Sequence, residues 1–183
     1  MSDQRYERLK ELLKRDAVRF GDFELASGKR SDVYVDGRLF TLSSDGAALA
    51  AELLWEKIEP LGVQAIGGMT LGADPIVGAI LAHAGRLGHS MAGYLVRKEP
   101  KGHGMKRCVE GPRPEGERPR VAILDDTMTT GGSTVKALRR VREEWNAEVV
   151  AAFAIVDREQ GAREAFEAEG ATFEALVTLD QLR

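Results

Sequence analysis

Residues 121–134, VAILDDTMTTGGST, constrain the fold more than any other part of the sequence. An apolar run of strand length leads into two carboxylates, Asp125 and Asp126, and then into a Thr/Gly/Ser turn that opens a helix. Such a strand–turn–helix unit is typical of a parallel α/β sheet, whose ligands lie at the carboxyl ends of the strands. Carboxylates suit hydroxyl groups or a magnesium ion, whereas N–H groups at a helix N-terminus suit a phosphate. A sugar phosphate would satisfy both halves of the motif.

The rest of the chain repeats this alternation of strands and helices. Amphipathic periodicity, capping residues and proline positions predict helices over about 3–16, 43–59, 75–87, 133–146 and 162–169. Apolar runs between turn residues predict short strands within 20–38, and strands near 63–67, 91–96, 121–124, 149–156 and 173–179. We therefore expect an α/β fold with a central, mostly parallel sheet flanked by helices on both faces. Four segments follow strand ends and should converge on one site: 67–75, 97–110, 125–134 and 157–161.

Composition narrows the classes of partner. The length suits one α/β domain, expected over residues 1–183. A formal net charge of −3, from 26 basic and 29 acidic residues, gives no general attraction to nucleic acid or to an anionic membrane. There is no apolar run of roughly 20 residues for a membrane span and no apolar signal-peptide region. The single cysteine, Cys108, fits a reducing compartment, so we expect a cytoplasmic protein.

The acidic pair and the glycines after it suggest specific roles. Because side chains alternate along a strand, Asp125 and Asp126 are expected to point to opposite sides and not to share a proton. Each would then bind a different hydroxyl, or one would bind a ribose through a metal ion. A plain capping or turn role is the alternative. Gly131 and Gly132 allow positive φ and a close approach of the backbone to an anion.

The motif resembles the phosphoribosyl-pyrophosphate-binding signature of the type I phosphoribosyltransferases, in which the acidic pair contacts ribose hydroxyls and the following loop holds the 5′-phosphate. Three further segments are similar to those of the orotate phosphoribosyltransferases within that family: SGKRSDVYVD (27–36), RKEPKGHG (97–104) and VDREQG (156–161). The resemblance implies the type I phosphoribosyltransferase fold with a small N-terminal hood, mainly from about 1–40. It also implies transfer of a 5-phosphoribosyl group from phosphoribosyl pyrophosphate to orotate, giving orotidine 5′-monophosphate and pyrophosphate in de novo pyrimidine (UMP) biosynthesis.

The resemblance also assigns roles to single residues. It implies catalytic roles for Lys101, His103, Asp125 and Asp126. It implies further substrate contacts from Arg97, Lys98, Thr127, Thr129, Thr130, Gly131, Gly132, Ser133, Arg158 and Lys29. Among these, Arg158 would pair with the carboxylate of orotate and Thr129 would contact the base. Mg²⁺ is the implied cofactor, held mainly through the substrate, with Asp125 as a candidate ligand.

The basic segment after residue 96 suits this chemistry. Residues 97–119 contain seven Lys or Arg, four Pro and four Gly, without hydrophobic periodicity. Phosphoribosyl transfer develops oxocarbenium character at the ribose while pyrophosphate leaves with growing negative charge. A cationic loop could neutralise that charge and exclude water, although a solvated basic loop is the alternative. In the family this loop reaches the neighbouring subunit's site, which implies a homodimer with loop 97–110 acting in trans.

Two positions depart from the pattern that many members share. Ala26 stands where many have a lysine, and Lys29 or Arg30 is the candidate replacement. The segment TLGADP (70–75) lacks another common lysine, so pyrophosphate binding there would rely on backbone N–H groups and Mg²⁺.

Two other functions share the opening motif. A purine phosphoribosyltransferase should lack both RKEPKGHG and the arginine of VDREQG. A nucleotide-sensing RNA-binding regulator of the same fold would need a basic surface, which the net charge of −3 disfavours.

Overall fold

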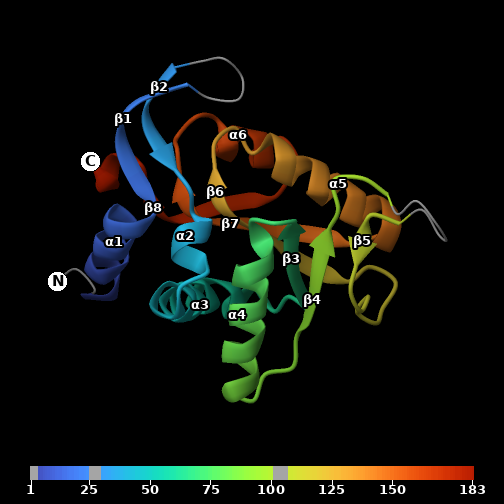
Figure 1. Cartoon of the computed structure of the whole chain (residues 1–183). Coiled ribbons are helices and arrows are strands. Elements are labelled where there is room, and N and C mark those ends of the chain that lie inside the picture. Colours follow the sequence, from blue (N-terminus) through green and yellow to red (C-terminus); the bar gives the residue numbers. More distant parts are fainter. Residues whose placement is uncertain (1–3, 25–29, 101–106) are drawn as a thin grey trace.

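The structure, a computed structural model, describes residues 4–24, 30–100 and 107–183 (Figure 1). Its main sheet has six strands in the order β5-β4-β3-β6-β7-β8. The strands are β3 (Ala65–Met69), β4 (Ala92–Val96), β5 (Val109–Glu110), β6 (Arg120–Met128), β7 (Glu148–Asp157) and β8 (Thr172–Thr178). All neighbours pair in parallel except β5, which runs antiparallel to β4. The predicted mostly parallel sheet is confirmed.

Helices cover both faces of this sheet, as the alternation predicted (Figure 1). On one face lie α3 (Ser44–Ile58) and α4 (Ala73–Arg86), and on the other lie α5 (Gly132–Trp145) and α6 (Ala162–Glu167). Successive side chains of a strand point to opposite sides, so each strand contributes residues in turn to the packing on both faces of the sheet. Ile66 and Leu124 join one buried cluster, while their neighbours Ala65 and Ile123 join the other.

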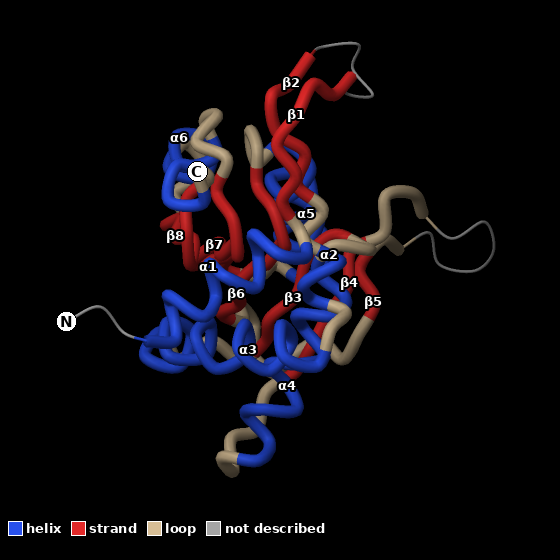
Figure 2. The backbone as a smooth tube through the Cα atoms, turned by 60° about the vertical axis from the view of Figure 1, so that its left-hand side comes forward, coloured by secondary structure: helices blue, strands red, loops and turns tan. Residues whose placement is uncertain are grey.

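The N-terminal part forms a separate hairpin beside the sheet. Strand β1 (Val18–Glu24) pairs antiparallel with β2 (Arg30–Val35), and the hairpin projects away from the main sheet (Figure 2). Helix α1 (Gln4–Asp16) precedes it and buries Leu9, Leu12 and Leu13 in the cluster shared with α3 and α4. The short helix α2 (Arg38–Thr41) then returns the chain to α3. Two 3₁₀ turns complete the elements, η1 (Glu59–Leu61) and η2 (Asp180–Leu182).

Three features differ from the sequence prediction. Strand β6 runs on to Met128, so both aspartates lie within a strand, because β7 is long enough to pair with it as far as Asp157. Neither α2 nor β5 was expected. Their four and two residues are too short to show a period. Among the described helices, none is long and apolar enough to cross a membrane.

Candidate active site

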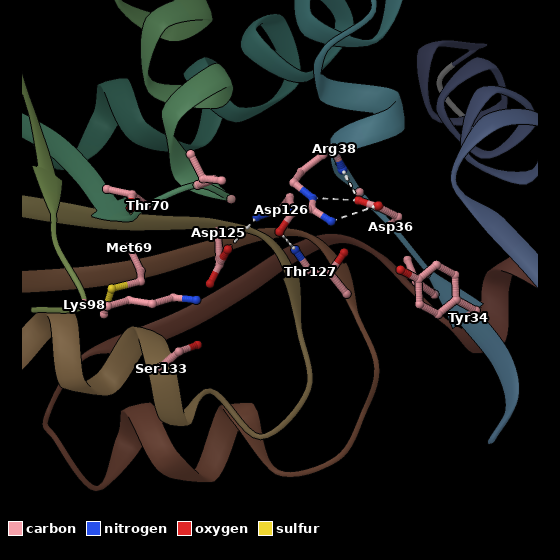
Figure 3. Close-up of a pocket in the computed structure, with 14 residues that line it drawn as sticks. Tyr34, Asp36, Arg38, Met69, Thr70, Lys98, Asp125, Asp126, Thr127 and Ser133 are labelled. Atoms are coloured by element: carbon pink, nitrogen blue, oxygen red, sulfur yellow. Dashed lines mark hydrogen bonds and ion pairs between the residues drawn. The ribbon is translucent and has the colours of Figure 1, made fainter. Parts of the chain in front are cut away.

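A cavity of about 520 Å³ opens at the carboxyl ends of β3 and β6 (Figure 3). Its walls come from the end of β2, the start of α2, the segments after β3 and β4, the end of β6 and the first turn of α5. The lining residues are Tyr34, Val35, Asp36, Gly37, Arg38, Met69, Thr70, Leu71, Gly72, Lys98, Asp125, Asp126, Thr127 and Ser133. Three of the four segments expected to converge thus meet here, whereas 157–161 borders a second cavity.

The two carboxylates are held by neighbouring donors. Asp125 accepts a hydrogen bond from the buried Thr134 hydroxyl at 2.6 Å and another from the backbone N–H of Asp126 at 3.0 Å. Asp126 accepts from the N–H of Thr127 at 2.8 Å. Because each carboxylate folds back onto the next backbone N–H, neither keeps the direction that simple strand alternation gives.

Gly72, just before α4, shows how close the two carboxylates come. A Cβ atom added to Gly72 would lie 2.4 Å from Asp125 Oδ1 and 2.8 Å from Asp126 Oδ1. Gly37 lies against Asp126 alone of the two, since its added Cβ would be 2.7 Å from Asp126 Oδ2. The expectation that the aspartates point apart is therefore wrong. Both present their Oδ1 atoms to one small space, which Gly72 keeps open.

Burial makes these carboxylates hard to ionise in the free protein. Desolvation raises the pKa of Asp125 to about 7; the Thr134 hydrogen bond opposes the rise and the charge of Asp126 adds to it. Desolvation likewise raises the pKa of Asp126. A ligand that donates hydrogen bonds or brings a cation would favour the ionised pair.

The turn before α5 is built to receive an anion. Gly131, its N-cap residue, has φ of 72°, which glycine adopts without strain, and no side chain caps the helix. Thr130, Gly132 and Ser133 are exposed around this N-terminus. Thr134, the next residue, points inward to Asp125 instead, so this turn (129–133) and the acidic pair are joined by one hydrogen bond.

The basic residues after β4 lie in different surroundings, one in the cavity and one on the surface. Lys98 lines the cavity of its own chain, and its amine extends toward Asp125 and Ser133 (Figure 3). Arg97 is exposed, with its guanidinium 3.9 Å from Glu110 of β5. Lys101 and His103, like Lys29 and Ala26 of the hood, lie outside the described residues.

Arg158 lies at the second cavity, of about 310 Å³, between the hood hairpin and the end of β7. Its backbone N–H donates to Met128 at 2.8 Å, which sets it beside the half-buried Thr129. Its Nη2 donates to Ser31 at 3.4 Å, while its buried Nε finds no partner among the described residues. This arginine therefore lines the second cavity with one guanidinium donor that no described group satisfies.

The residues around the first cavity fit a metal ion only in part. Within residues 4–24, 30–100 and 107–183, no group of three or more Asp, Glu, His or Cys side chains could hold an ion. Asp125 and Asp126 supply oxygen ligands of the kind that Mg²⁺ prefers, so a bound Mg²⁺ would take its other ligands from a substrate.

The sequence predicted that the acidic pair, the turn and Lys98 belong to one site, and the structure brings them to one cavity; several other lining or contacting residues were not predicted. Thr134 stood within the opening motif without an assigned role. The Asp36–Gly37–Arg38 corner carried only the signal of a turn, and Gly72 only that of a loop.

Comparisons with known proteins find relatives that cover nearly the whole chain. No protein-family model matches the chain. The curated orotate phosphoribosyltransferase of Aquifex aeolicus is 42% identical over 179 residues, covering 96% of each chain. The solved orotate phosphoribosyltransferase of Mycobacterium tuberculosis, in complex with Fe(III) dicitrate, is 40% identical with a TM-score of 0.84. It covers 98% of this chain and 99% of that one. A second structure of that enzyme, in complex with phosphoribosyl pyrophosphate, is 35% identical with a TM-score of 0.79 over the same shares.

Proposed function

The chain belongs to the orotate phosphoribosyltransferase family, and from this premise we propose how its residues divide the reaction. It is a pentosyltransferase that moves the 5-phosphoribosyl group from phosphoribosyl pyrophosphate to orotate. A ring nitrogen of orotate bonds to ribose C1 and loses its proton, while the bond from C1 to the pyrophosphate oxygen breaks and the leaving pyrophosphate takes up a proton. The products are orotidine 5′-monophosphate and pyrophosphate, as de novo UMP biosynthesis requires.

The donor is held across the first cavity. Asp125, Asp126 and Thr127 bind the ribose hydroxyls, and the turn from Thr129 to Ser133 binds the 5′-phosphate through N–H groups and hydroxyls. The observation that carries this assignment is the direct link between the two halves, the 2.6 Å hydrogen bond from Thr134 to Asp125. A sugar phosphate that spans both halves meets carboxylates at one end and an uncapped helix N-terminus at the other.

The leaving pyrophosphate lies toward Lys98 and the backbone of residues 70–72. Lys98 supplies a positive charge inside the cavity. Arg97, Lys101 and His103 add cationic contacts by their match to the family loop, and His103 is the candidate proton donor. Mg²⁺, when bound through the substrate and Asp125, neutralises part of the pyrophosphate charge.

Orotate lies at the second cavity, between the hood hairpin and the end of β7. Arg158 pairs with its carboxylate through the donors that it holds beside Ser31, and Thr129 contacts the ring. Lys29, on the segment that joins the two hood strands, is the further cation for this end. The chain then acts as one domain over 1–183, in which the hood from about 1–40 supplies part of the substrate site.

The active form is a cytoplasmic homodimer in which the basic loop 97–110 acts in trans through Lys101 and His103, while Lys98 stays in the site of its own chain. Leu39, Leu42 and Leu71 support a dimer, because these large apolar side chains are 57%, 73% and 65% exposed. With Pro75 they border a third cavity, directly beside the first. The single cysteine is buried, which fits a reducing compartment.

A base-specificity assay tests the proposed reaction. The protein is incubated with phosphoribosyl pyrophosphate, Mg²⁺ and one of orotate, uracil, adenine or hypoxanthine, and consumption of the base is followed. We expect turnover of orotate alone, because Arg158 needs a carboxylate to pair with. Turnover of a purine but not of orotate would contradict the assignment.

Donor binding should tighten as the pH rises toward neutrality. Since burial raises the pKa of Asp125 to about 7, the free protein carries a proton there at lower pH, and binding of ribose hydroxyls releases it. The affinity should rise by up to about tenfold per pH unit below 7 and level off above it. Thr134→Val removes a hydrogen bond that favours the ionised form of Asp125, so the pKa of Asp125 should rise. The pH above which the affinity no longer increases should then be higher than in the wild type.

Calorimetry in buffers of different ionisation enthalpy measures the released proton. The same titration with Asp125→Asn corrects for protons that come from the donor's own phosphates. Equal proton release by Asp125→Asn and the wild type would show that this carboxyl is already ionised in the free protein.

A further inference from the structure

Two charged side chains on α5 hold both segments that flank residues 101–106. The Arg140 guanidinium donates to the carbonyl of Arg97 and, at 2.8 Å, to that of Lys98. One helical turn later, the Glu144 carboxylate accepts from the N–H groups of Cys108 at 2.7 Å and Val109 at 3.1 Å. The two side chains share one face of the helix, because residues four apart lie above one another.

This arrangement matches each charge to the backbone groups it meets. The arginine, which only donates, faces two carbonyls, and the carboxylate, which only accepts, faces two N–H groups. Arg97 N–H also donates to the Cys108 carbonyl at 2.8 Å, so the two segments are tied to each other as well. Hydrogen bonds to charged groups are stronger than neutral ones, so residues 97–98 and 108–109 are held more firmly than an ordinary surface loop.

The same helix begins at the active site. Ser133, in the first turn of α5, lines the first cavity together with Lys98. We propose that Arg140 and Glu144 are positioning residues for phosphoribosyl transfer: they tie the backbone of Lys98 to α5. Arg140 does so directly, whereas Glu144 acts through residues 108–109, to which Arg97 is hydrogen-bonded. The ammonium group thereby keeps its place relative to the phosphate turn and the acidic pair. This inference rests on the proposed function, since it concerns the pyrophosphate contact of Lys98.

Steady-state kinetics with a double-mutant cycle tests the proposal. Arg140→Met and Glu144→Gln should each lower kcat by about 10- to 100-fold, because small misplacements of a catalytic group have effects of that size. The KM for orotate and the affinity for ribose 5-phosphate should stay within about twofold, because neither residue touches those ligands. Arg140→Lys, which keeps a donor, should recover part of the rate. The neighbouring replacements Arg139→Met and Glu143→Gln are the matched controls and should retain wild-type kcat.

The cycle with Lys98 separates positioning from general stability. In a Lys98→Ala background, Arg140→Met should have no further effect on kcat, since the group that it positions is gone. Equal losses in both backgrounds, or wild-type kcat for Arg140→Met, would overturn the proposal. If Arg140→Met does not fold, as judged by thermal unfolding, Arg140→Gln enters the same cycle with the same criteria. The wild type and the two control variants are assayed with orotate first. If they do not use orotate, the proposed function is contradicted instead of the positioning role.

Discussion

Gly72→Ala should lower kcat/KM for phosphoribosyl pyrophosphate by at least about 100-fold, because shifts of about 1 Å in catalytic groups have effects of that order. The new methyl group would lie 2.4 Å from Asp125 Oδ1 and 2.8 Å from Asp126 Oδ1, closer than atoms pack. The backbone of Gly72 itself has φ of −63° and ψ of −42°, which alanine adopts freely. The variant should therefore fold and lose activity through displaced carboxylates alone.

Gly78→Ala is the matched control for this variant. It lies within α4, the helix that Gly72 precedes, and an added Cβ there meets nothing within 4 Å. Its kcat/KM should equal that of the wild type, and its stability should rise by up to about 1 kcal/mol from the better helix propensity of alanine. Steady-state kinetics and thermal unfolding measure both variants side by side. Wild-type activity of Gly72→Ala would mean that the aspartates tolerate displacement, contrary to the role given to them.

The layered fold could be predicted from sequence because it depends on local periodicity. The run from Val121 to Leu124 is apolar at every position, as a strand buried on both faces must be, and it ends in a turn that glycine permits. Elements that depend on a partner could not be predicted in this way. Strand β5 exists only because β4 offers an edge, and β6 is long only because β7 pairs with its polar end.

The residues of the site differ in the same way, since local sequence predicts some of them and not others. Asp125, Ser133 and Lys98 carry chemistry in their own side chains, so the strand–turn pattern and the family resemblance together predicted them as site residues. Gly72 and Thr134 act through contacts with Asp125 that no local pattern reports. The direction of the two carboxylates was mistaken for the same reason, since strand alternation says nothing about hydrogen bonds between successive residues.

The resemblance gave the whole loop 97–110 one role in trans, but the structure gives a reason to divide it. Lys98 lines the cavity of its own chain, where Arg140 of the same chain holds its backbone. Lys101 lies outside the described residues, and its role in the partner's site comes from the family. A lysine that acts within its own chain and a lysine that acts across the dimer respond differently when two inactive variants are mixed.

Mixing variants should therefore restore activity for Lys101 but not for Lys98. Homodimers of Lys98→Ala, Lys101→Ala or Asp125→Asn should each lose at least about 100-fold in kcat, because each lacks a charge near the reacting groups. An equal mixture of Lys101→Ala and Asp125→Asn should recover about a quarter of wild-type activity, since half of the symmetric dimers become mixed with one complete site.

The mixture of Lys98→Ala with Asp125→Asn is the control, and it should stay inactive. Asp125 and a cis-acting Lys98 belong to the same chain, so no site in a mixed dimer contains both. Light scattering establishes the dimer, and native mass spectrometry of one isotope-labelled variant establishes subunit exchange. Recovery in both mixtures would mean that Lys98 also crosses to the partner. Recovery in neither, with exchange established, would mean that each chain uses its own loop, and the shared site would have to be abandoned.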